Sequence, residues 1–323
     1  MLLFGALALA PASGDAKPPP PSPREAKVAV YIDLINSESN HTLQNLDTYA
    51  GRIADLRKGP TCEEGGPQSW LSSMGPSAAE RIAGYKKGLA RPPVLPGDAP
   101  AQEMVAALEA LRPVVEEASR YYFMSEFHED GCKRGRALHP QLMDGLTRYA
   151  RADRALRAYV DQYTEERDAA ELLTLQKKYG PGLHYHHRKL IVEAKAMMRM
   201  CRQKPLDLAA VKARLGGYTP AVEGARAAVT AVRTPRNTDA LYQGGYDQFV
   251  GTAASFGNPV GDFVRFVERQ AREAEEPLTR GQDAKSRAAF AAEERDRTIG
   301  NLITTYNLLV EQSNNVMYSK SMK

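Results

Sequence analysis

Apolar residues recur in alternating steps of four and three along two long stretches, one near each end of the chain. The first stretch runs from about residue 28 to 56, and the last from about 285 to 317. Such steps are typical of an amphipathic helix that packs an apolar stripe against other helices. We expect the two helices to pack together and to close a single helical body.

Tyrosines and asparagines accompany both stripes. Polar side chains at a helix seam fix the register between helices at some cost in stability. The sequence therefore predicts an interhelical polar layer, and its candidate members are Tyr31, Asn36, Asn40, Tyr306, Asn307 and Asn314. A channel lined by tyrosines that holds a ligand is the functional alternative.

The middle of the chain has the same helical periodicity. It predicts further helices over about residues 104–122, 139–179, 185–203, 207–232 and 238–267. No pair of alternating strands with a hairpin turn is present. The expected fold is all-α: an elongated helical bundle of about six or seven helices, with kinks and one long loop in the N-terminal half.

Proline and glycine predict where these helices break. Pro113 should kink or divide its helix, and Pro140 should open the next one at its first position. Residues 216–220 and 257–259 should interrupt two later helices. The charged run over residues 164–168 is expected to be a solvated part of a continuing helix.

Residues 59–100, rich in Gly, Pro and Ser, form the expected loop excursion. Ser77 and Glu80 have the spacing of a capping box, which predicts a short helix inside the excursion. Trp70, the only tryptophan, should anchor this loop on the bundle, with a partner-facing role as the alternative. Asp207 should cap the helix that follows it.

The sequence predicts four segments along the chain. Residues 1–12 resemble a secretory signal, because a short apolar run is followed by small residues. Residues 13–25 form a Pro-rich tether. A single all-helical domain should cover 26–318, and 319–323 a C-terminal tail. Export to the periplasm or cell envelope is the expected localisation, and a disordered apolar tail is the alternative for the start.

The overall composition is that of a globular protein. Hydrophobic residues make up 43% of the chain, charged residues 25%, and the net charge is only +4. Charges this balanced do not favour nucleic acid as a partner. They are compatible with proximity to anionic lipid headgroups at a membrane surface.

Three cysteines stand at positions 62, 132 and 201. Cys62 and Cys132 both lie in loop-like sequence that contains glycine, so we expect them to form a disulfide if the protein is exported. Cys201 lies on an apolar helical face and is expected to pack as a small hydrophobic residue.

The weak metal candidates are His184, His186 and His187, the only histidine cluster. One helical turn separates the first and last of these, so both can face one ion. The alternative is a set of ordinary histidines at the start of a helix. No HExxH, GxSxG or GxxxxGK[ST] motif is present, so we expect no catalytic residues and no cofactor.

Four short motifs resemble those of the YiiG-like family of bacterial envelope proteins, a family of unknown function. They are Tyr31-Ile-Asp-Leu-Ile-Asn36, Tyr121-Tyr122, Leu138-His-Pro-Gln-Leu142 and Tyr306-Asn-Leu-Leu-Val-Glu-Gln-Ser-Asn314. The resemblance covers about residues 26–318. It implies an exported all-helical protein, often a lipoprotein, and supplies no catalytic residues. The lipobox cysteine of a lipoprotein is missing from this sequence.

These patterns together favour an exported, non-enzymatic helical protein of the cell envelope that binds an unknown protein or envelope partner. Two alternatives stay open. One is a bundle that binds a small apolar or aromatic ligand between Tyr- and Asn-lined helices. The other is a metal-dependent enzyme centred on His184, His186 and His187. The sequence leaves the oligomeric state open.

Overall fold

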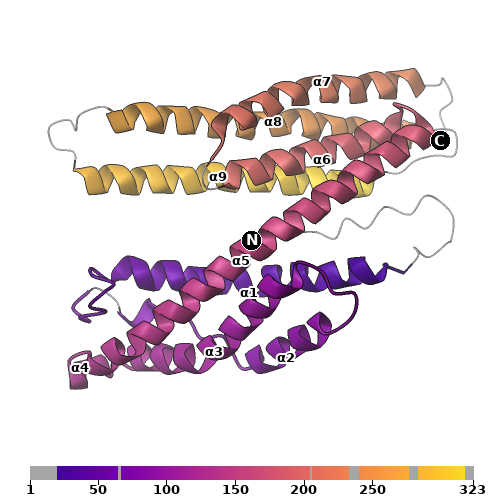
Figure 1. Cartoon of the computed structure of the whole chain (residues 1–323). Coiled ribbons are helices and arrows are strands. Elements are labelled where there is room, and N and C mark those ends of the chain that lie inside the picture. The colour runs from indigo at the N-terminus through magenta and orange to yellow at the C-terminus, as the bar shows by residue number, and fades with distance from the viewer. Residues whose placement is uncertain (1–19, 65–66, 204–205, 233–239, 276–282, 317–323) are drawn as a thin grey trace. The chain divides into compact units, whose positions relative to one another are not determined.

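The computed structural model describes residues 20–316, except 65–66, 204–205, 233–239 and 276–282 (Figure 1). The prediction of an all-α fold is confirmed over these residues, which contain nine α-helices and one short 3-10 helix. The expected number, six or seven, was too low. A twelve-residue helix forms inside the predicted loop, and a four-residue helix forms before Gly131.

The described residues form two compact units, 20–166 and 167–316, and the boundary falls inside helix α5 (Lys133–Tyr179). Each unit is described by itself. The single domain over 26–318 stays a prediction. None of the described helices is both long and apolar enough to cross a bilayer.

Unit 1 contains α1 (Pro23–Arg52), η1 (Pro67–Ser69), α2 (Ala78–Leu89), α3 (Asp98–Phe123), α4 (Phe127–Asp130) and the first part of α5. A capping box starts α1: the Ser22 hydroxyl accepts from the Glu25 amide at 3.3 Å, and the Glu25 carboxylate accepts from the Ser22 amide at 2.7 Å. The helix therefore includes the last three residues of the segment expected to be tether.

The core of unit 1 forms where the apolar stripes of α1, α2, α3 and α5 meet. Tyr31, Leu34 and Ile35 of α1 are fully buried there. Gly145 lets α5 approach α3 closely, because a Cβ atom at this position would lie 2.6 Å from a Leu111 methyl carbon. Trp70 is also fully buried, and its ring packs against Tyr49 and Tyr122. It anchors the loop, as predicted, and does not face a partner.

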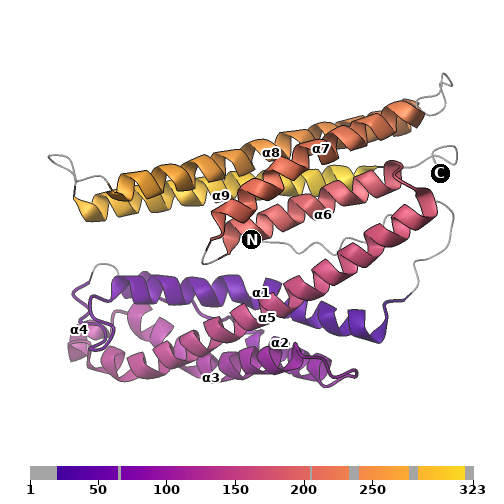
Figure 2. The same ribbon diagram turned by 45° about the horizontal axis from the view of Figure 1, so that its top comes forward.

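Unit 2 contains the end of α5 followed by α6 (Leu183–Arg202), α7 (Leu208–Val232), α8 (Ala240–Glu275) and α9 (Ala284–Asn315). Helix α6 packs on α7 and α9, and α8 packs on α7 and α9, so the four close into a bundle (Figures 1 and 2). Phe249, Phe256 and Leu309 are among its fully buried residues. The expected cap on α7 is confirmed, since Asp207 accepts from the Ala210 amide at 2.9 Å.

Two of the predicted helix breaks were wrong. Residues 216–220 lie inside α7 and residues 257–259 inside α8, and both helices are continuous. Pro113 lies inside α3 and does not divide it; the kink expected there as the other outcome stays a prediction. A proline within a helix costs about 3 kcal/mol. Buried residues on both sides of each break, such as Phe256 and Val260 in α8, offset that cost by packing.

One predicted helix start was also wrong. Helix α5 begins at Lys133, seven residues before Pro140, because the Asp130 carboxylate accepts from the Arg134 amide at 2.9 Å and caps the first turn. The short helix predicted after Ser77 does begin there, at Ala78, but its predicted capping box is absent: Ser77 makes no capping hydrogen bond, and its hydroxyl accepts from Arg81 at 2.7 Å instead.

The inward face of α1 carries polar residues that bind the predicted loop excursion and α5. Four of them are Lys27, Glu38, Ser39 and Asn45, each at most 5% exposed. We call these four residues the polar seam of α1. Glu38 pairs with Arg81 at 2.6 Å, and Ser39 contacts Tyr149 at 3.1 Å and Asp153 at 2.5 Å.

Asn45 binds the loop backbone. Its side-chain amide donates to the Ser72 carbonyl and accepts from the Ser72 amide, both at 2.9 Å. Lys27 donates to the carbonyls of Leu89 and Arg91 at 2.5 and 2.6 Å and lies 3.0 Å from Asp98. Residues 72–98 are thus not a free loop but a segment bound to α1 at both of its ends.

We predict that Asn45→Ala destabilises unit 1 by about 1–3 kcal/mol, because the two backbone groups of Ser72 lose their buried partners. Asn40→Ala is the matched control, since Asn40 lies exposed on the same helix; it should change the stability by less than about 0.5 kcal/mol. Urea unfolding followed by Trp70 fluorescence measures both. Equal effects of the two substitutions would contradict the role of Asn45.

Candidate functional site

The three candidate metal-ligating histidines face different neighbours. His184 stacks on Tyr179 with a centroid distance of 4.5 Å, and His186 lies edge-on to Tyr185. His187 Nε2 lies 2.7 Å from the Ser313 hydroxyl, and burial lowers its pKa to about 3. Over the described ranges, no three His, Cys, Asp or Glu side chains are grouped so as to hold a metal ion.

The candidates for an interhelical polar layer lie in separate units. Tyr31 donates to Asp98 at 2.7 Å inside unit 1. Tyr306 packs against Phe256 inside unit 2, and burial raises its pKa to about 12. Asn36 is half-buried, and the remaining three asparagines, Asn40, Asn307 and Asn314, are exposed. Asn45, absent from the predicted layer, is the buried asparagine of α1.

A buried charge cluster joins α5 and α6 in unit 2. Asp168 lies 2.7 Å from Arg188, 3.4 Å from Lys195 and 3.5 Å from Arg167. Burial lowers the pKa of Lys195 to about 8, although the Asp168 carboxylate opposes this effect. The expectation of a solvated stretch over 164–168 was therefore wrong for Asp168, which is 1% exposed.

A second polar cluster fixes the start of α3. Burial pushes the pKa of Asp98 up, but hydrogen bonds from Tyr31, the Leu95 amide and Lys27 outweigh it and hold this pKa below its usual value. Asp98 therefore stays ionised beside Lys27. One feature of the sequence points to the Lys27–Asp98 pair. Lys27 lies one helical turn before Tyr31, on the helix face that the apolar stripe predicts to be buried.

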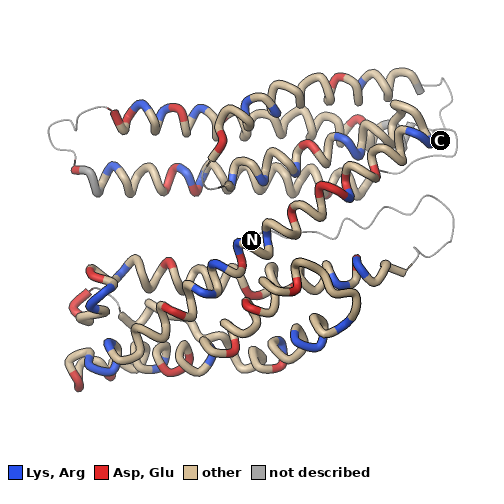
Figure 3. The backbone as a smooth tube through the Cα atoms, viewed as in Figure 1, with Lys and Arg blue, Asp and Glu red and all other residues tan. Residues whose placement is uncertain are grey.

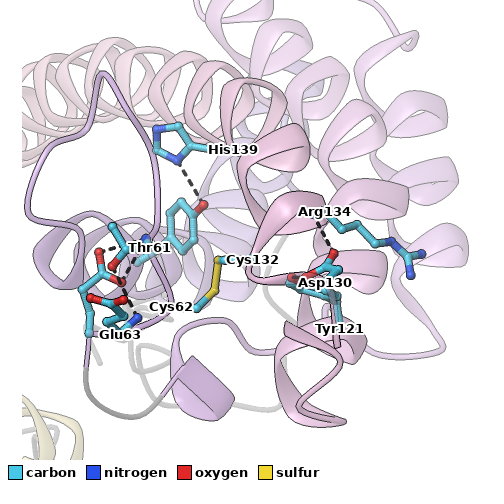
Figure 4. Close-up of a disulfide and its surroundings, with 10 residues drawn as sticks. Thr61, Cys62, Glu63, Tyr121, Asp130, Cys132, Arg134 and His139 are labelled. Atoms are coloured by element: carbon cyan, nitrogen blue, oxygen red, sulfur yellow. Dashed lines mark hydrogen bonds between the residues drawn. A yellow bond between two sulfur atoms is a disulfide. The ribbon is translucent and has the colours of Figure 1, made fainter. Parts of the chain in front are cut away.

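The most elaborate set of contacts surrounds the turn between α3 and α5, residues 124–132, which we call the braced turn. Cys132 at its end forms a disulfide with Cys62 (Figure 4). The structure thus brings together the two cysteines that the sequence paired. Cys201 is a buried free thiol, and burial raises its pKa to about 12.

Backbone hydrogen bonds shape the start of the braced turn. Ser125 has a left-handed backbone with φ of 58°. The Ser125 amide donates to the Tyr122 carbonyl, and the Glu126 amide donates to the Tyr121 carbonyl. This pair of bonds is a Schellman motif, which ends a helix and reverses the chain. Glycine is the usual residue at that position, so a serine gave no sequence signal for the turn.

Side chains hold the braced turn from both sides. Arg134 donates to Glu117 of α3 and to Glu126 of the turn at about 3.0 Å, and thereby links α5 to both. Tyr121 donates to Asp130 at 2.7 Å (Figure 4). Gln68, on the segment that the disulfide ties down, donates to the Ser125 hydroxyl at 3.1 Å. Four of these contacts reach the turn itself, namely those at Ser125, Glu126, Asp130 and Cys132, and together they restrict it.

An aromatic cluster supports the same end of unit 1. Tyr49, Trp70, Tyr121 and Tyr122 pack ring to ring with centroid distances of 5.1–6.4 Å. His139 joins them: its Nε2 lies 2.7 Å from the Leu56 carbonyl, which can only accept, so Nε2 carries the proton and Nδ1 accepts from Tyr49 at 3.0 Å.

Two adjacent large apolar side chains project from this braced region into solvent. Phe123 is 70% exposed and Met124 is 62% exposed. A single exposed apolar residue is ordinary on a protein surface. Two in succession, at the junction of α3 with a turn restricted by a disulfide and by ion pairs, form a small rigid apolar point. This point is the candidate functional site, and the sequence gives no signal for it because periodicity does not show which residues are exposed at a helix end.

The fold and this site define an all-helical protein with a disulfide-closed unit. A model of the family described as "Protein of unknown function (DUF3829)" matches residues 23–315, and the chain belongs to that family. It is 25% identical over 205 residues to the "Uncharacterized protein YiiG" of Escherichia coli (strain K12). The aligned part covers 63% of this chain and 58% of that protein.

The resemblance to a YiiG-like family of unknown function is thereby confirmed. This chain matches less than two thirds of the length of the E. coli relative. No solved structure matches the chain.

We predict that replacing Cys62 and Cys132 by serine lowers the stability of unit 1 by about 4 kcal/mol, because the crosslink spans 70 residues and restricts the unfolded chain. Urea unfolding followed by Trp70 fluorescence measures the change with and without dithiothreitol. The reductant should bring the native protein to the level of the double-serine variant and leave that variant unchanged. If dithiothreitol does not change the stability of the native protein, the stabilising role of the disulfide is contradicted.

Proposed function

We propose that this protein is an exported helical protein of the bacterial envelope that acts as a binding module. Its contact point is the Phe123–Met124 pair, and its partner is another envelope protein with an apolar pocket. The observation that carries the proposal is the braced turn, which holds these two exposed side chains in place.

Rigidity is the reason to connect the braced turn with binding. A partner that buries Phe123 and Met124 removes apolar surface from water, which favours association. Binding also costs the conformational entropy of the groups that it orders, and a turn already fixed by Arg134, Tyr121 and the disulfide has little backbone entropy left to lose. Large side chains that anchor in a pocket typically dominate such interfaces.

The disulfide supports export. Disulfides persist in the periplasm and outside the cell, and are rare in the reducing cytosol. Cys62 and Cys132 have positive φ angles of 62° and 64°, which non-glycine residues seldom adopt. The crosslink helps to hold both residues in that conformation. The signal-like residues 1–12 agree with export, and they lie outside the described residues.

The buried titratable groups support binding in preference to catalysis. Asp98 is bonded to Lys27 and Tyr31, and His139 to Tyr49 and the Leu56 carbonyl. Asp168 is held by its cations in unit 2. In each case the polar atoms serve contacts between helices. Because these buried groups are bonded to other residues of the protein, they favour neither a metal-dependent enzyme at the histidines nor a ligand channel between the tyrosines.

Site-specific photocrosslinking tests the proposal. Phe123→p-benzoylphenylalanine places a reactive ketone at the contact point, and Arg136→p-benzoylphenylalanine places it at an exposed position of α5 in the same unit. Irradiation of the native bacterium should give one discrete adduct from position 123, recovered in the periplasmic or envelope fraction, and none from position 136.

Recovery of the protein from the cytosol would contradict export. An adduct pattern that is the same at both positions, or no adduct at position 123 in cells with normal amounts of protein, would contradict the contact point.

A further inference from the structure

Helices α8 and α9 continue past the end of the four-helix bundle of unit 2. Their distal parts lie side by side beyond α6 and α7 in both views (Figures 1 and 2). Among the described side chains, burial in α8 ends at Phe266, and burial in α9 begins at Leu302. The two helices therefore form a projecting arm, residues 267–275 and 284–301.

A groove of about 460 Å³ lies along this arm. Its lining combines the apolar residues Pro259 and Phe266 with charged and polar side chains of both helices. The charged and amide-bearing members are Asp262, Arg265, Glu268, Arg269, Arg272, Glu294, Arg297 and Asn301. Charges of both signs alternate along the arm, as Figure 3 shows.

Each carboxylate of the groove already has its own cation. Asp262 pairs with Arg265, and Glu294 pairs with Arg269. Glu268 pairs with Lys212 of α7, whose hydrogen bond is the largest cause of the lowered pKa of this glutamate. Each of the three carboxylates therefore pairs closely with one cation, and the lining carries two further arginines, Arg272 and Arg297.

The two remaining arginines come from opposite sides of the groove. Arg272 belongs to α8, and its charge helps to lower the pKa of Glu268, although no salt bridge of Arg272 is found within the described part of the chain. Arg297 belongs to α9 and makes a long ion pair of 3.8 Å with Glu294, which also pairs more closely with Arg269. Asn301, one turn after Arg297, adds an exposed amide donor.

We propose that this groove binds the phosphate group of a small molecule or of a lipid headgroup, with Arg272 and Arg297 as its two cationic contacts. A guanidinium group donates two parallel hydrogen bonds to an oxyanion. A tetrahedral phosphate presents oxygens to both sides of the groove, so one arginine from each helix can bind it. The site lies in unit 2 and does not depend on the braced turn.

Substitution of both arginines tests the site against a variant with the same change in charge. Arg272→Gln with Arg297→Gln removes the two contacts. Arg226→Gln with Arg295→Gln, two arginines outside the groove lining, is the matched control. Titration calorimetry with inorganic phosphate, at constant ionic strength set by chloride, measures free phosphate. Co-sedimentation with vesicles of phosphatidylglycerol and phosphatidylcholine (1:3) measures the headgroup.

The groove variant should bind at least tenfold more weakly than the native protein, and the control should bind like the native protein. Loss in the calorimetric arm identifies a free phosphate compound as the ligand, and loss in the vesicle arm identifies a lipid headgroup. If the native protein binds neither phosphate nor phosphatidylglycerol vesicles, or if both variants lose binding equally, the proposal is overturned.

Discussion

Polar side chains on the buried face of a helix must find hydrogen-bond partners, and this requirement organises unit 1. Lys27, Glu38 and Asn45 of α1 are buried, and an unpaired buried charge or amide would cost several kcal/mol. Their partners come from residues 72–98. A segment whose flanks on both sides of α2 are rich in glycine and proline is thereby fixed against α1.

The fixed segment in turn makes the candidate site possible. Directly before it in the chain are Trp70, which packs against Tyr122 next to the braced turn, and Gln68, which binds the turn directly. The disulfide adds a covalent tie between the same two parts of the chain. Phe123 and Met124 are therefore presented by a support that extends from α1 through the loop to α5. The groove in unit 2 does not depend on this support. Its three carboxylates each pair with another cation, so Arg272 and Arg297 make the groove positively charged overall.

Periodicity predicted the helical elements well and their interruptions badly. Helix α6 and helix α9 lie within two residues of the predicted bounds, because long apolar stripes specify them. Pro220 and Pro259 were expected to break helices, but packing on both sides of each keeps the helix intact. The stripe also showed where polar residues stand on α1 without showing their partners. Asn40 and Asn45 are alike in sequence, and only tertiary contacts distinguish them.

The most direct test of this account is a double-mutant cycle between Lys27 and Asp98, followed by Trp70 fluorescence in urea. Lys27→Met and Asp98→Leu each leave the other charge buried and unpaired, so each alone should destabilise unit 1 by about 3–5 kcal/mol. The two together should cost about 1–3 kcal/mol less than the sum of the single changes. If the effects add within about 0.5 kcal/mol, the buried polar contacts of α1 do not hold the loop segment in place.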